Sequence, residues 1–159
     1  MGSDAERLLP KPIYRRISSE PFGPTQGDHQ FEINVVFTTA KGTMAALKAA
    51  QVLAHDLDAQ TLLLVPQVVP LQFPLSSPPV SIAFTQRRAY AMAMDCQRGG
   101  DIRVQVYLCG DRQKCLIKVL KPQSLVLIGG KKRWWPAPEQ KLAEALRVGG
   151  HKVIFVNGE

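Results

Sequence analysis

The sequence has no long hydrophobic run, although 45% of its 159 residues are hydrophobic. No apolar stretch approaches the roughly 20 residues that cross a bilayer as a helix, so the sequence predicts no membrane span. The N-terminus reads MGSDAERLLPKPIYRR and has no apolar segment after its charges, which excludes the pattern of a secretory signal. Glu6 stands where the myristoylation pattern after Gly2 requires serine or threonine. We therefore expect a cytoplasmic protein.

Cysteine and histidine are scarce, with three of each. Cys96, Cys109 and Cys115 form no CxxC motif, and no histidine stands at ligand spacing from them. We expect no metal and interpret the cysteines as free buried thiols in a reducing compartment. The sequence also offers no Ser/His/Asp or Cys/His pairing and no paired carboxylates in the expected crevice loops, which predicts a non-enzymatic protein.

Acidic residues are fewer than basic ones, which gives a net charge of +7. Most of the cations are scattered, and three stand in a run, Lys131, Lys132 and Arg133. Scattered cations are typical of a solvated surface, so nucleic-acid binding is disfavoured. A weak nucleic-acid-associated module that uses this run and the N-terminal segment remains an alternative.

Large apolar side chains are few in residues 1–30, which are rich in proline, glycine, serine and charge. Such a segment cannot offset the entropy of ordering on its own. We predict a flexible, disordered tail over residues 1–30 and one folded domain over residues 31–159.

The domain alternates between strand and helix patterns. Strands are expected at 31–39, 61–65, 102–109, 124–128 and 152–156, and helices at 43–59, 77–96, 112–120 and 138–148. This order predicts an α/β fold with a five-stranded parallel sheet, Rossmann-like, with helices on both faces.

Several details of these elements are predicted from local chemistry. Thr43 is the expected N-cap of the first helix, and the five prolines of residues 66–79 predict a stiff loop. The second helix should place Phe84, Tyr90, Met92 and Met94 in the core. Alternation in residues 102–109 predicts an edge strand whose wetter face carries Arg103, Gln105 and Tyr107.

Ligands of such sheets bind beyond the carboxyl ends of the strands, where the strand order reverses. The loops after the first and fourth strands, TTAKGT and GGKKRWWP, are expected to flank that crevice.

Three segments together resemble the universal stress protein family, over about residues 32–157. NVVFTTAKGTMAALKAA is similar to the family's first strand, ligand loop and first helix; VYLCGDRQKCLIKVL is similar to its "GD" turn and third helix. SLVLIGGKKR followed by LAEALRVGGHKVIFV resembles its last two strands and last helix. The resemblance implies a regulatory or interaction domain in the stress response.

Members that bind ATP carry an acidic residue after the first strand, and a GxxG followed nine residues later by Gly and Ser or Thr. Here Thr38 replaces the acid and Lys132 replaces the second glycine, while Gly129 keeps the first. Neither Leu142–Ala143 nor Glu139–Gln140 restores the Gly-Ser pair.

The resemblance therefore implies a degenerate ATP site and no required cofactor. Adenine-nucleotide binding through the Gly129–Arg133 loop, with cations in place of backbone contacts, remains an alternative. The candidate nucleotide- or anion-binding residues are Thr38, Thr39, Val65, Gly129, Gly130, Lys131, Lys132 and Arg133.

Trp134 and Trp135 follow the cations directly. One could cover the last helix while the other is partly exposed; a stacked base and a protein partner are the alternatives. The last strand, with Val153, Ile154, Phe155 and Val156, lies at a sheet edge in the family's strand order and carries no charge or proline in this run. We expect it to form a homodimer interface.

Overall fold

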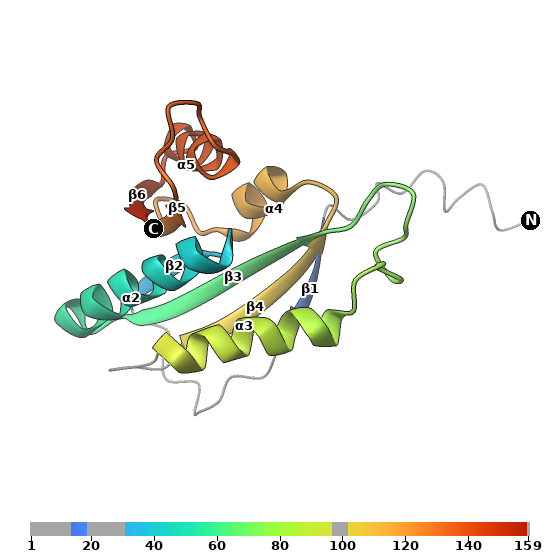
Figure 1. Ribbon diagram of the computed structural model, residues 1–159, viewed down its shortest axis with the longest axis horizontal. Helices are drawn as coiled ribbons and strands as arrows, with labels where there is room; N and C mark the ends of the chain where they lie inside the picture. The colour runs from blue at the N-terminus through green and yellow to red at the C-terminus, as the bar shows by residue number, and fades with distance from the viewer. Residues whose placement is uncertain (1–13, 19–30, 97–101, 159) are drawn as a thin grey trace, which may run out of the picture.

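The computed structural model describes residues 14–18, 31–96 and 102–158. Within these residues six strands form one sheet in the order β1-β4-β3-β2-β5-β6 (Figure 1). The strands are β1 (Tyr14–Ser18), β2 (Glu32–Val36), β3 (Gln60–Val68), β4 (Ile102–Cys109), β5 (Leu125–Gly130) and β6 (Lys152–Asn157). The helices are α2 (Ala40–Leu57), α3 (Ile82–Cys96), α4 (Arg112–Val119) and α5 (Pro138–Val148).

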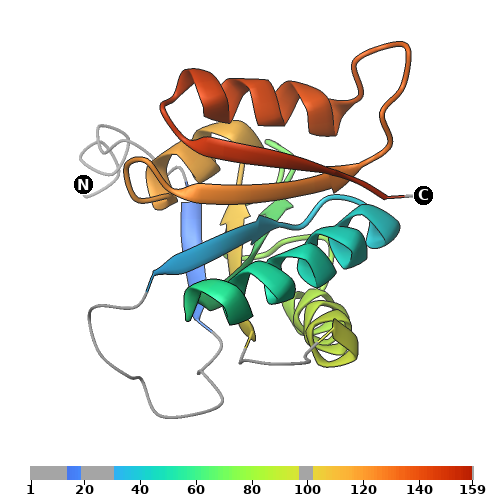
Figure 2. The ribbon, with the colours of Figure 1, turned by 90° about the vertical axis from the view of Figure 1, so that its left-hand side faces the viewer.

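The predicted parallel sheet is confirmed. Every neighbouring pair among β2 to β6 is parallel. Helices α2 and α3 pack on one face of the sheet, and α4 and α5 on the other (Figure 2). This is the Rossmann-like α/β arrangement that the alternation of strands and helices predicts.

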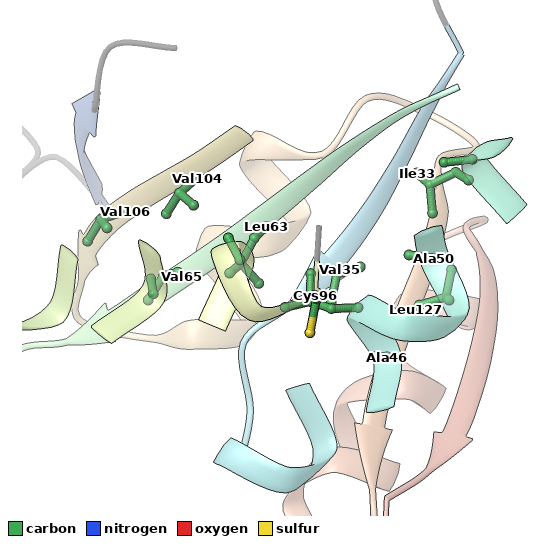
Figure 3. Packing of buried hydrophobic residues seen from close by; sticks show 14 residues of the cluster. Ile33, Val35, Ala46, Ala50, Leu63, Val65, Cys96, Val104, Val106 and Leu127 are labelled. Atoms are coloured by element: carbon green, nitrogen blue, oxygen red, sulfur yellow. The ribbon is translucent and has the colours of Figure 1, made fainter. Parts of the chain in front are cut away.

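The core is built on the central strand β3. Leu63 and Val65 point into the cluster under α2 and α3, which Figure 3 shows, whereas Leu62 and Leu64 point into the cluster under α4 and α5. A strand covered on both faces needs apolar side chains at consecutive positions, because successive side chains point to opposite faces. The run TLLLV meets that need.

A sixth strand joins the sheet from within the expected tail. β1 pairs antiparallel with β4, with Tyr14 opposite Cys109 and Ser18 opposite Gln105. Strands pair through backbone groups, so a prediction that relied on the scarcity of apolar side chains missed this one. Five residues of the expected tail thus form a strand; residues 1–13 and 19–30 lie outside the described residues.

Two element boundaries differ from the sequence prediction. β3 continues through Pro66 to Val68, although prolines were expected to exclude strand there. Proline is tolerated because β2 ends opposite Leu64, so beyond that point β3 pairs with β4 alone. α3 begins at Ile82 rather than near Ser77, since a residue that precedes proline disfavours helical backbone.

Three side chains differ from the prediction in their exposure to solvent. Phe84 is 54% exposed and Met94 is 70% exposed, so α3 contributes less to the core than expected. Tyr107 is buried rather than wet, and its hydroxyl donates to the side-chain oxygen of Gln105 at 2.6 Å. An aromatic ring with a satisfied hydroxyl buries apolar area at little polar cost.

No helix among the described residues is both long enough and apolar enough to cross a membrane.

Candidate functional site

The strand order reverses between β2 and β5, where the sequence predicts a ligand crevice. β2 has β3 on one side and β5 on the other. At their carboxyl ends, the hydroxyl of Thr38 donates to the carbonyl oxygen of Gly129 at 2.6 Å. The two predicted loops therefore do lie side by side.

The first turn of α2 fills this crevice. A Cβ added to Gly129 would lie 1.8 Å from the carbonyl oxygen of Gly42, and one added to Gly42 would lie 2.4 Å from the carbonyl oxygen of Gly129. Two glycines here allow helix and strand backbones to touch, which any side chain would prevent. No space for a ligand group is left between them.

Threonine hydroxyls hold the end of β2 against α2. The backbone N–H of Thr38 donates to the hydroxyl of Thr43 at 2.9 Å, and Thr43 is fully buried. The hydroxyl of Thr39 accepts from the N–H of Gly42 at 3.1 Å, so Thr39 is the N-cap of α2. The prediction of Thr43 as the cap is wrong: the helix begins one turn earlier, and Thr43 ties that turn to Thr38.

Two other predicted ligand residues are buried by the fold. Val65 is 3% exposed and belongs to the core cluster under α2 and α3 (Figure 3). Gly130 lies beneath α5, since an added Cβ would be 3.1 Å from the Cβ of Glu139 and 3.2 Å from the ring of Phe155. Neither residue lines a described cleft at the switch point.

A small cleft of about 330 Å³ remains at the mouth of the filled crevice. It brings together three predicted residues, Thr39, Lys131 and Arg133, while Lys132 is outside its lining. Lys41 and Glu139, from the first turns of α2 and α5, also line it. Cations beside two helix N-termini favour an anion, and Glu139 opposes one. Lys41 was missed because nothing in the sequence shows which way the loop TTAKGT faces.

A larger groove of about 750 Å³ lies between α4 and α5. Trp134 lines it and is 94% exposed, while Trp135 is 78% exposed and stands outside its lining. The interpretation in which one tryptophan covers the last helix is wrong, because both side chains remain largely in solvent.

Cys109 and Cys115 form a pair of buried thiols where β4 ends and α4 begins. A hydrogen bond from Cys115 lowers the pKa of Cys109. The same hydrogen bond, together with burial, raises the pKa of Cys115. The described residues contain no group of three His, Cys, Asp or Glu side chains that could hold a metal ion.

β6 lies at the edge of the sheet and pairs with β5 along its inner side. Val153 and Phe155 pack against the core cluster under α4 and α5, and Val156 packs against the one under α2 and α3. Ile154 is 42% exposed. The strand thus presents a backbone edge and one prominent apolar side chain.

No family model matches the sequence, and no curated protein matches it. Among solved structures, the chain is similar to one described as the crystal structure of a universal stress protein in complex with cAMP, with 13% sequence identity and a TM-score of 0.46. The similarity covers 82% of this chain and 100% of that chain.

Proposed function

We propose that this chain is a non-enzymatic regulatory or interaction domain of the universal-stress-protein type, acting in the stress response, whose ATP site is degenerate. The observation that carries the proposal is the contact between Gly42 and Gly129, which occupies the switch-point crevice. A phosphate-binding loop must present free backbone N–H groups to its ligand. Here the N–H of Gly42 is bonded to Thr39, and the backbone of Gly129 faces α2.

The adenosine side of the site supports the same conclusion. Thr38 stands where ATP-binding relatives carry an acid, and its hydroxyl already donates to Gly129. Val65 is buried and has no surface to offer a base. A nucleotide would have to displace α2 from β5 before it could bind between them.

Calorimetric titration with ATP at physiological salt tests this proposal. We expect no binding in the micromolar range, and no adenine nucleotide released when the purified protein is denatured. An ATPase assay should give no turnover above buffer. Low-micromolar ATP affinity, co-purified nucleotide or turnover would each refute the proposal.

A second candidate function is the binding of a small anionic ligand, an adenine nucleotide included, in the 330 Å³ cleft. It is favoured by the three cations Lys41, Lys131 and Arg133, which line one cleft from the first turn of α2 and from the loop after β5. Titration with inorganic phosphate and with AMP, followed by NMR, should move the amide signals of these residues. Arg133→Ala should weaken the effect, while Lys132→Ala, outside the lining, should leave it unchanged. Equal effects of both variants would refute a built cleft.

The homodimer and the cytoplasmic location remain proposals. Support for the dimer comes from the position of β6 at the sheet edge, because an uncovered edge presents unpaired backbone groups to a second chain.

A further inference from the structure

The groove between α4 and α5 extends along the whole length of α5. Its lining extends from Trp134 and Pro136, before α5, to Val148 and Gly149 at the helix end. Since α5 has 11 residues, the groove is about 16 Å long, or about three helical turns. Ile117 of α4 forms part of the opposite wall.

Large apolar side chains in this groove are exposed. Trp134 is 94% exposed, Val148 is 82% exposed and Ile117 is 45% exposed. They come from a loop and two helices, yet they line one concave surface. Concave apolar surfaces with a prominent tryptophan are typical of the centres of protein interfaces.

The charges around the groove are mainly positive. α4 carries three cations, Arg112, Lys114 and Lys118, which lie outside the lining itself, and no acid. Arg133 and Lys141 line the groove, and among the described residues no ion pair engages either of them. Glu144 is the acidic side chain of the lining, and Arg147 pairs with it at 3.6 Å. A segment that docks here gains most if it carries carboxylates beside its apolar face.

We propose that this groove binds an acidic amphipathic helix from a partner protein. Apolar residues of that helix at i, i+3 or i+4, and i+7 contact Trp134, Ile117 and Val148, while its carboxylates reach Arg133 and Lys141. A nucleic acid fits less well, because Val148 and Ile117 offer nothing to phosphates and Trp134 is a single stacking surface. The inference rests on the proposed role as an interaction domain and names the class of its partner.

The test uses the full chain and a synthetic 11-residue helical peptide that has leucines at i, i+3 and i+7, glutamates on its other face and no tryptophan. We expect saturable binding that shifts tryptophan emission to the blue and weakens with salt. Trp134→Ala, followed by calorimetry because it lacks the reporting tryptophan, should weaken binding about tenfold or more. Trp135→Ala is the matched control, because Trp135 is also largely exposed, at 78%, but lies outside the groove, and it should change the affinity little.

Lys141→Glu tests the role of charge and should weaken peptide binding. Lys48→Glu is its control, because it makes the same change at an exposed site on α2, and it should leave peptide binding unchanged. A peptide with lysine in place of each glutamate should fail to bind. The proposal is overturned if the lysine peptide binds as well, if no peptide binds, or if oligodeoxythymidine binds more tightly than the acidic peptide. It is also overturned if the tryptophan emission depends on protein concentration alone, which would assign the groove to a second copy. The ATP titration has a separate readout, so failure here leaves the degenerate nucleotide site standing.

Discussion

Gly42 and Gly129 lie in direct backbone contact, 87 positions apart in the sequence, so that a Cβ on Gly129 would be 1.8 Å from the carbonyl oxygen of Gly42. This contact seats the first turn of α2 on the end of β5. It also occupies the place where the fold would otherwise hold a ligand. One packing relationship thereby positions the helix and reduces the crevice to the 330 Å³ cleft at its mouth.

Replacing Gly129 with alanine should destabilise the protein by about 1 to 3 kcal/mol or more, because the new methyl group must push α2 away from β5. The matched control is Gly110→Ala, since a Cβ at Gly110 meets nothing within 4 Å. Urea unfolding of both variants measures the difference. Equal stabilities of the two variants would contradict the Gly42–Gly129 contact.

Replacing Thr43 with valine should cost about 1 to 3 kcal/mol of stability, because the valine keeps the shape but leaves the N–H of Thr38 without its acceptor. Thr43→Ser keeps a hydroxyl and should preserve the hydrogen bond, losing only the packing of a methyl group. Thermal unfolding compares the two. A valine variant more stable than the serine variant would show that the hydrogen bond matters less than the packing.

The fold was predictable where side-chain pattern alone determines it. The run TLLLV and the alternation of strands and helices predict a parallel sheet, and β2 to β6 form one. The side-chain pattern failed to predict the structure where backbone geometry determines it. β1 joins the sheet through main-chain pairing, and Pro66 stays in β3 because one side of that strand is free there.

The site was predictable only in part. Sequence placed Thr38 and Gly129 in neighbouring loops, and they share a hydrogen bond. It did not show that Gly42 would fill the space between those loops, because a close approach depends on where α2 sits in three dimensions. The helix was predicted to begin at Thr43, so Gly42 was placed outside it, and its close packing against Gly129 had no signal in the pattern.

Replacing Cys115 with alanine should raise the pKa of Cys109, because Cys115 supplies the hydrogen bond that lowers it and burial alone raises it. In a Cys96→Ala background these two are the remaining thiols, so ultraviolet absorbance of the thiolate against pH measures the change. Absorbance should begin at higher pH in Cys115→Ala, whereas Cys115→Ser can still donate and should begin near the parent.

The stability consequence has a definite sign. A lowered native pKa of Cys109 contributes stability that is present above the unfolded pKa of the thiol and is lost as the pH falls through the native pKa. Cys115, whose native pKa is raised, acts oppositely and loses its contribution as the pH rises above its unfolded pKa. Removal of the Cys115 donor should therefore abolish the gain from Cys109. If thiolate absorbance began at the same pH in Cys115→Ala as in the parent, the result would contradict the hydrogen-bonded pair.

Ile154→Lys should convert a homodimer into a monomer. In a dimer built by two-fold pairing of β6, the two copies of the strand pair with each other along their outer backbone edges. Ile154, 42% exposed, lies beside that edge. A lysine here places like charges across the axis while the buried side of the strand keeps its packing.

Val156→Lys is a poorer test, because Val156 packs against the core and its loss also weakens the fold. Val52→Lys is the control, an exposed valine on α2 given the same charge. Light scattering at micromolar concentrations should find dimers of the parent and of Val52→Lys and monomers of Ile154→Lys; a monomeric parent, or an Ile154→Lys variant that stays dimeric, would rule out β6 as the interface.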